Sequence, residues 1–215
     1  MRRLIVLLVI LTVVLPVAAQ SKLKEMNAQE TSALQKRWKE SAATIKSIDC
    51  DFVQTKHMAV FKKDIRSKGH FQFRRENKIR MEYTNANGKP AYETIMNGNK
   101  LKVVSGGKSN ILDLGSNQMV AEMGKSLTAC MTGDITKINT AYKLTYFSNN
   151  KEYMIRIVPK AEEQREYIRE LQITLSRSNL SVTSLTIDES DNNTTVYRFT
   201  NVKYNTITNY ARFAM

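Results

Sequence analysis

Apolar and polar residues alternate in two short runs between residues 69 and 83, in the sequence GHFQFRRENKIRMEY. In the second run Ile79, Met81 and Tyr83 share one face, and charged residues occupy the other. Side chains alternate across a strand with a period of two, so the pattern predicts two strands, each with one apolar face. Residues 75–77 would form the turn. The predicted hairpin has an aromatic and methionine-rich face and a charged opposite face, which suits binding of an apolar ligand better than catalysis.

An amphipathic helix is predicted before the strands, over residues 22–46, because apolar residues recur there every three or four positions without glycine or proline. A shorter, methionine-rich helix is predicted at residues 116–131. The run AEEQREYIREL fits either a strand or a helix. Turn sequences such as NANGKP and NGN separate the remaining strand patterns. These patterns cover residues 48–61, 69–75, 78–84, 91–96, 100–105, 110–114, 142–159, 166–176, 180–188 and 194–203.

Consecutive strands with short connections predict an antiparallel meander, so the fold class is mainly β (α+β). A strongly curved sheet of this kind has a concave face that must be covered, and the two predicted helices are the natural cover. The chain shows no internal repeat, low-complexity segment or domain linker. We therefore expect one domain over residues 20–215.

The first 19 residues have the features of a secretory signal peptide. Arg2 and Arg3 precede a continuous apolar run, and Val17-Ala18-Ala19 fits a cleavage site. The run is short for a membrane span, although an uncleaved anchor is the alternative. Residues 1–19 are thus predicted to be removed, which predicts an exported protein.

The chain is strongly basic, with 33 Lys and Arg against 20 Asp and Glu. In an exported protein this charge does not predict a nucleic-acid partner, because it is spread over strand backs and turns. A solvated basic surface is one explanation. Attraction to anionic lipid headgroups or to an acidic protein is the other.

No catalytic or metal-binding pattern is evident. Cys50 and Cys130 could form a disulfide in an oxidising compartment or remain buried thiols, and their spacing does not fit a metal site. His57 and His70 lie in strand patterns and are predicted to be surface residues. Cys50 with His57 lacks a third, orienting group. We therefore expect no enzyme activity, cofactor or metal, with a secreted lipid or glycan hydrolase as a distant alternative.

Four segments carry a combined pattern: SIDCDFVQTK, GHFQFRRENKIRMEY, ETIMNGNKLKVV and IDESDNNTTVYRFTNVKYN, followed by Phe213. In this order they resemble the outer-membrane lipoprotein carrier protein family, LolA, of Gram-negative bacteria. The resemblance covers essentially the whole chain after the signal peptide. It implies an unclosed antiparallel β-barrel of about eleven strands, covered by a lid of helices.

The resemblance also implies a function. Members of the family take acylated lipoproteins from an inner-membrane lipoprotein-releasing transporter, shield their acyl chains, and carry them through the periplasm to an outer-membrane acceptor. The turn arginine of the family matches Arg75, which would bond to the lid and couple closure of the cavity to release. Where the family has proline, this chain has Glu76, and Ile79 stands where an aromatic residue is common. We expect the mature protein to be a monomer.

A carrier of acyl chains needs an adaptable apolar surface, which methionine side chains can provide. Ordinary core packing is the alternative for each apolar residue considered. We predict a lid latch at Arg75 and a lipid-binding lining formed by Phe52, Phe71, Phe73, Ile79, Met81 and Met96, with Trp38, Met119, Met123 and Leu127 in the lid or the lining. A lipid- or lipoprotein-sensing regulatory module of the envelope on the same fold is the main alternative function.

Overall fold

The computed structural model describes residues 22–85, 87–114, 128–129, 132–133, 135 and 138–215. Within them, a 12-stranded sheet has the order β1-β8-β9-β10-β11-β12-β2-β3-β4-β5-β6-β7. Neighbouring strands are antiparallel, and the edge strands of the described part, β1 and β7, do not pair with each other. The predicted fold class, an unclosed antiparallel barrel with a helical lid, is confirmed. The strands are β1 (Lys24–Glu25), β2 (Ser47–His57), β3 (Ile65–Arg74), β4 (Lys78–Thr84), β5 (Pro90–Asn97), β6 (Lys100–Ser105), β7 (Lys108–Asp113), β8 (Tyr142–Ser148), β9 (Glu152–Pro159), β10 (Ile168–Ser176), β11 (Val182–Glu189) and β12 (Thr194–Tyr204).

Most predicted strands are present, but several have other bounds; β3, for example, begins at Ile65 instead of residue 69. The strand predicted over 48–61 is too long: β2 ends at His57, and the Phe61 amide donates to the Met58 carbonyl in a turn (2.9 Å). The pattern over 142–159 forms two strands, because the Asn149 side chain accepts bonds from the backbone amides of Lys151 and Glu152 in the turn between them. The ambiguous AEEQREYIREL contains both the short helix α3 (Glu162–Arg165) and the start of β10.

The first helix, α1, spans Ala28–Ala43, so the helix predicted over 22–46 is too long at both ends. Asn27 and Glu30 form a capping box, in which each side chain accepts a bond from the other residue's backbone amide. This cap fixes the start of the helix and leaves residues 24–25 free to pair with β8 as β1. One face of α1 is buried through Leu34, Trp38 and Ala42.

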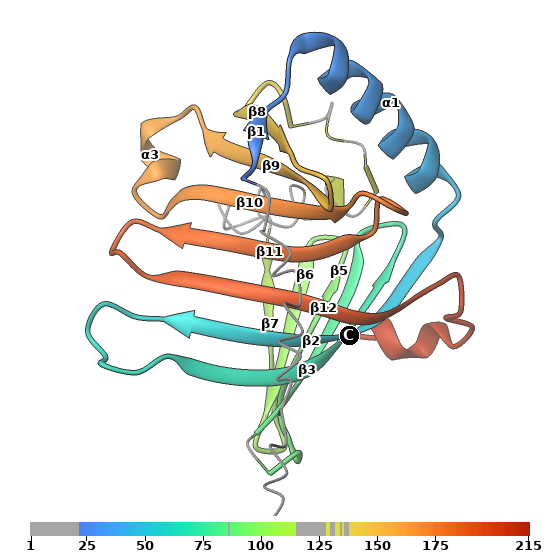
Figure 1. The fold of residues 1–215 in the computed structure, drawn as a ribbon. Coiled ribbons are helices and arrows are strands. Elements are labelled where there is room, and N and C mark those ends of the chain that lie inside the picture. The colour runs from blue at the N-terminus through green and yellow to red at the C-terminus, as the bar shows by residue number, and fades with distance from the viewer. Residues whose placement is uncertain (1–21, 86, 115–127, 130–131, 134, 136–137) are drawn as a thin grey trace, which may run out of the picture.

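Buried apolar side chains form two clusters on the concave side of the sheet. One joins α1 to β8, β9 and β10, and the other lies on β2, β3 and β4. Figure 1 shows α1 lying across the β8–β9 end, while β5–β7 run across the direction of β10–β12 because the sheet twists strongly. The helix therefore covers one half of the concave face and reaches the other half with its C-terminal end.

The C-terminal tail packs on the opposite, outer face of the sheet. It contains the short 3-10 helix η3 (Tyr210–Phe213), which contacts β4 and β5. The guanidinium of Arg74 lies 3.7 Å from the ring centroid of Tyr210, a cation–π contact. The Asn97 side chain donates to the Phe213 carbonyl (3.0 Å), and the Phe213 ring is buried.

The second helix predicted, over 116–131, lies almost wholly outside the described residues. This includes Met119, Met123, Leu127 and Cys130. Ala129 is described and is buried in the cluster beneath α1. In the described part of the chain, the helices are all too short or too polar to span a lipid bilayer.

Candidate functional site

The concave face of β2–β4 carries a cluster of aromatic side chains. Phe52, Phe71 and Phe73 are almost completely buried, because alternate positions of β2 and β3 face the same side. The rings of Phe52 and Tyr83 meet edge to face, with centroids 5.1 Å apart. Gly69 pairs with Phe52 across the strands, and the ring covers the place where a side chain would be.

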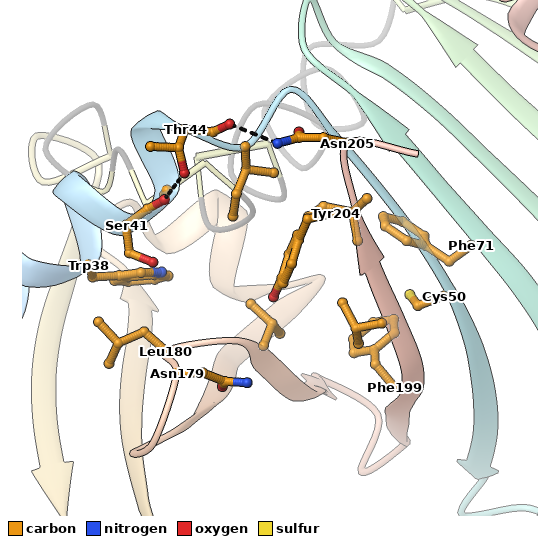
Figure 2. A pocket seen from close by; sticks show the side chains of 15 residues that line it. Trp38, Ser41, Thr44, Cys50, Phe71, Asn179, Leu180, Phe199, Tyr204 and Asn205 are labelled. Carbon is orange, nitrogen blue, oxygen red and sulfur yellow. Dashed lines mark hydrogen bonds between the residues drawn. The ribbon is translucent and has the colours of Figure 1, made fainter. Parts of the chain in front are cut away.

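A cavity of about 140 Å³ lies between this face and the C-terminal end of α1. Figure 2 shows Trp38 on one side, Phe71 and Phe199 on the other, and the Tyr204 side chain between them. The cavity therefore joins the two apolar clusters. It is lined by Trp38, Ser41, Ala42, Thr44, Ile45, Ile48, Cys50, Phe71, Asn179, Leu180, Val182, Phe199, Val202, Tyr204 and Asn205.

The volume of the cavity limits what it can hold. An apolar cavity of about 150 Å³ holds one benzene molecule. At about 140 Å³, this cavity accepts part of an apolar chain but not a whole acyl chain. A larger apolar ligand would need a wider cavity, and the end of α1 forms one of the walls.

Arg75, in the β3–β4 turn, holds that end of α1. Its Nε donates to the Ile45 carbonyl (2.6 Å), and one terminal nitrogen donates to the carbonyls of Ala42 (2.7 Å) and Ala43 (3.2 Å). Carbonyls at a helix C-terminus lack partners within the helix and attract positive charge. The last turn of α1 contains no basic residue, so Arg75 supplies this charge from the sheet.

Asn205, which directly follows β12, fixes the connection between α1 and β2 from a second direction. Its side-chain oxygen accepts bonds from the backbone amides of Lys46 (2.6 Å) and Ser47 (3.2 Å). Its side-chain nitrogen donates to the Thr44 carbonyl (3.1 Å), the bond drawn in Figure 2. The connection between α1 and β2 is thus fixed by the sheet at two points.

Residues 43–215 match the family described as outer membrane lipoprotein carrier protein LolA. The chain belongs to this family. A comparison with curated proteins gives no match.

Several solved structures resemble the chain at a distance. A DUF1329 family protein from Desulfovibrio piger is 10% identical, with a TM-score of 0.49, over 86% of this chain and 96% of that one. The Mycobacterium tuberculosis lipoprotein LppX is 10% identical, with a TM-score of 0.48, over 85% and 99%. A chain of the Pseudomonas aeruginosa MucA/MucB complex is 11% identical, with a TM-score of 0.47, and the match covers 86% of this chain and 61% of that one. Similarity this distant carries no information about function, so the assignment to LolA depends on the sequence match.

The turn that carries Arg75 differs from the LolA pattern. Glu76, which stands where the family has proline, has a φ angle of 75°, and Asn77 has 57°. Proline is restricted to a φ angle near −65°, so this turn could not contain it. Arg75 nevertheless reaches the lid helix, and Lys78 pairs with the Glu76 carboxylate (3.1 Å). The contact between Arg75 and the lid helix is thus made without a proline in the turn.

The structure gathers most of the predicted lining on one face. Trp38 and Phe71 line the cavity itself. Phe52, Phe73 and Ile79 are buried in the aromatic cluster, and Met81 and Met96 pack against that cluster. Met119, Met123 and Leu127 lie outside the described residues.

β11 and β12 also contribute side chains to the cavity lining, and none of them was predicted from the sequence. In β12, Tyr197 and Phe199 alternate as expected for one face. A register shift between Thr200 and Lys203 then moves Val202 and Tyr204 onto that same face. Simple alternation predicts the first pair, but the bulge hides the second pair from a period-two pattern.

The residues considered for catalysis are separated by the sheet. Cys50 is a free, buried thiol on the concave face, and burial, together with the charges of Asp49 and Asp51, raises its pKa to about 12. A thiol in this state is a poor nucleophile. The His70 ring lies on the outer face, 3.0 Å from Asp51 and 3.2 Å from Asp49. His70 is therefore an ion-pair residue there, and neither it nor the exposed His57 contributes to the cavity.

The same outer cluster has perturbed acid–base properties. Burial alone would lower the pKa of His70, but hydrogen bonds and charges from Asp51 and Asp49 outweigh it and raise that pKa. Hydrogen bonds from Asn201 and His70 lower the pKa of Asp51.

Among the described residues, no group of His, Cys, Asp and Glu is arranged to hold a metal ion.

Proposed function

We propose that this protein is a periplasmic carrier that binds the acyl chains of lipoproteins under its lid helix and transports them from the inner to the outer membrane. The observation that carries this proposal is the apolar cavity between the concave face and the end of α1, which hydrogen bonds from Arg75 hold closed. Membership of the LolA family supports it.

The energetics suit reversible binding. Transfer of an acyl chain from water to an apolar site is favourable by about 0.8 kcal/mol per CH₂ group. Part of this free energy is used to open the lid, because the closed cavity is too small for the chain. Closure of the lid then competes with the ligand, so a carrier of this design binds less tightly than its apolar surface alone would allow.

The remaining parts of the proposal follow from the predicted signal peptide and from the family. Cleavage of residues 1–19 would release a single carrier domain, residues 20–215, into the periplasm. The carrier would act as a monomer, accept lipoproteins from an inner-membrane lipoprotein-releasing transporter, and pass them to an outer-membrane acceptor. It would have no catalytic activity and no cofactor.

The test compares a triacylated lipopeptide with the same peptide lacking acyl chains, each titrated into the purified protein in a fluorescence assay. We expect binding of the acylated form alone, in competition with a fluorescent fatty acid. Val182→Trp places a bulky ring in the cavity and is expected to weaken binding at least about tenfold. Val53→Trp, on the exposed outer face of β2, is the matched control and should bind normally.

Two outcomes would overturn the proposal. The first is no preference for the acylated peptide. The second is equal binding by the Val182 and Val53 variants, which would place the ligand outside the cavity. A protein that binds the acylated peptide but never transfers it between inner- and outer-membrane vesicles would instead support the sensing module.

A further inference from the structure

The loop between β2 and β3 exposes a cluster of large apolar side chains. Val60 is 80% exposed, Phe61 is 53% exposed and Ile65, at the start of β3, is 47% exposed. Among the described residues, Val60 is the most exposed large hydrophobic side chain. Single exposed apolar residues are ordinary, but three within six positions form a patch. We call residues 58–65 the tip loop.

The tip loop has a defined shape. The Phe61 amide donates to the Met58 carbonyl (2.9 Å), which closes a turn around Val60. The Ala59 amide donates to the Asn193 side chain of the β11–β12 turn (2.9 Å), which ties the loop to the neighbouring strands. The apolar side chains are therefore presented on a fixed turn, at the end of the sheet that also carries the β11–β12 turn and α3 (Figure 1).

The tip loop and its flanking residues are basic in sequence, and one of their lysines, Lys56, pairs with Glu189 at the end of β11 (3.8 Å). Residues 56–68 contain Asp64 as their one acidic residue, and it is paired with His57 (3.0 Å). Their five basic residues are Lys56, Lys62, Lys63, Arg66 and Lys68. Lys62 and Lys63 directly follow the exposed Phe61, so positive charge stands beside the apolar side chains.

We propose that the tip loop docks the protein on an anionic phospholipid membrane, with Val60 and Phe61 entering the headgroup–acyl boundary and the lysines binding lipid phosphates. Apolar side chains flanked by lysines fit such a surface, because apolar insertion and attraction to anionic headgroups act together. The tip loop is remote from the cavity, since none of its residues lines it. Docking would hold even if the cavity bound no acyl chain.

The test is flotation of the protein with vesicles of equal parts phosphatidylcholine and phosphatidylglycerol, compared with phosphatidylcholine alone. The protein used in this test is prepared without residues 1–19, because their apolar run would bind vesicles by itself. All described elements begin at Lys24 or later, so this truncation leaves them intact. We expect binding to the anionic vesicles, weakened by added salt. V60S/F61S should weaken it at least about tenfold, and K62S/K63S about tenfold.

The matched control is I111S/L112S on β7, where Ile111 is 49% and Leu112 is 48% exposed. It likewise replaces two exposed apolar side chains, in another part of the sheet, and should leave vesicle binding unchanged. The proposal is overturned if the parent protein ignores anionic vesicles, if V60S/F61S binds them normally, or if the control loses binding equally. It is also overturned if the tip loop instead joins two copies of the chain, seen as a dimer that V60S/F61S dissociates without vesicle binding.

A second measurement separates this proposal from the carrier function. V60S/F61S is expected to bind the fluorescent fatty acid as the parent does. Vesicle docking that depends on the tip loop, without fatty-acid binding, would uphold the docking site and refute the carrier. Fatty-acid binding without docking would do the reverse.

Discussion

Replacing Arg75 by leucine tests whether the turn arginine keeps the lid helix closed. The substitution removes the donors to the carbonyls of Ala42, Ala43 and Ile45 and leaves the rest of the cavity intact. Arg74→Leu is the matched control. It removes an identical charge one residue away, where the side chain contacts Tyr210 on the outer face.

The expected magnitude follows from the bonds that are lost. Hydrogen bonds that involve a charged group contribute roughly 1.5–3 kcal/mol each, and two of those made by Arg75 are partly buried. Allowing for carbonyls that water can partly satisfy, the closed state should lose about 3 kcal/mol. This corresponds to a shift of about 100-fold from closed toward open.

A lid that opens more easily should bind acyl ligands more tightly, because less of the binding free energy is spent on opening. Arg75→Leu is therefore expected to raise the affinity for a fluorescent fatty acid, by up to about 100-fold if the closed state dominates. Hydrogen exchange of the backbone amides at the end of α1 should accelerate by a similar factor. If Arg75→Leu matched Arg74→Leu in both measurements, the proposed latch would be wrong.

Three other substitutions test local features of the fold. Glu76→Pro installs the residue that the family prefers and should lower the melting temperature by about 5 °C or more, since proline cannot adopt a φ angle of 75°; an unchanged melting temperature would count against this. Gly69→Ala places a methyl group against a backbone carbonyl of β4 and the ring of Phe52, and should reduce the free energy of unfolding by about 2 kcal/mol in urea titrations; an unaltered midpoint would contradict it. The raised pKa of His70 means that its ion pairs stabilise the fold below the unfolded pKa of about 6.5 and lose this effect as pH rises through the folded pKa. Relative to the control His57→Gln, His70→Gln should therefore destabilise the protein by up to about 1 kcal/mol near pH 5.5 and by less near pH 9. Equal losses of stability at the two pH values would refute the raised pKa of His70.

The sheet and its apolar face could be predicted because local patterns determine them. β4 and β6 begin and end where alternation and turn sequences place them. The start of α1 was also present in the sequence as Asn27 followed by Glu30, but apolar residues at 23 and 26 extended the helical pattern past this cap. A capping box takes precedence there because it satisfies backbone donors that no other group provides.

The arrangement of the lid depends on contacts distant in sequence, and patterns could not predict it. The residue Asn205 was part of the family resemblance, yet its bonds to the link between α1 and β2 appear only when β12 lies beside β2. Likewise, the bulge in β12 adds Val202 and Tyr204 to the cavity. In contrast, Arg75 was identified through the family resemblance, although its Glu76 neighbour has a backbone conformation that the family's proline could not share.

The consecutive residues Arg74 and Arg75 contact two different coverings of the sheet. Arg74 extends outward to Tyr210 of the C-terminal tail, and Arg75 extends inward to the lid helix. Arg74 ends β3 and Arg75 directly follows it, so alternation along the chain sends their side chains to opposite faces. Neighbouring residues of the chain therefore anchor the C-terminal tail and the lid helix on opposite faces of the sheet.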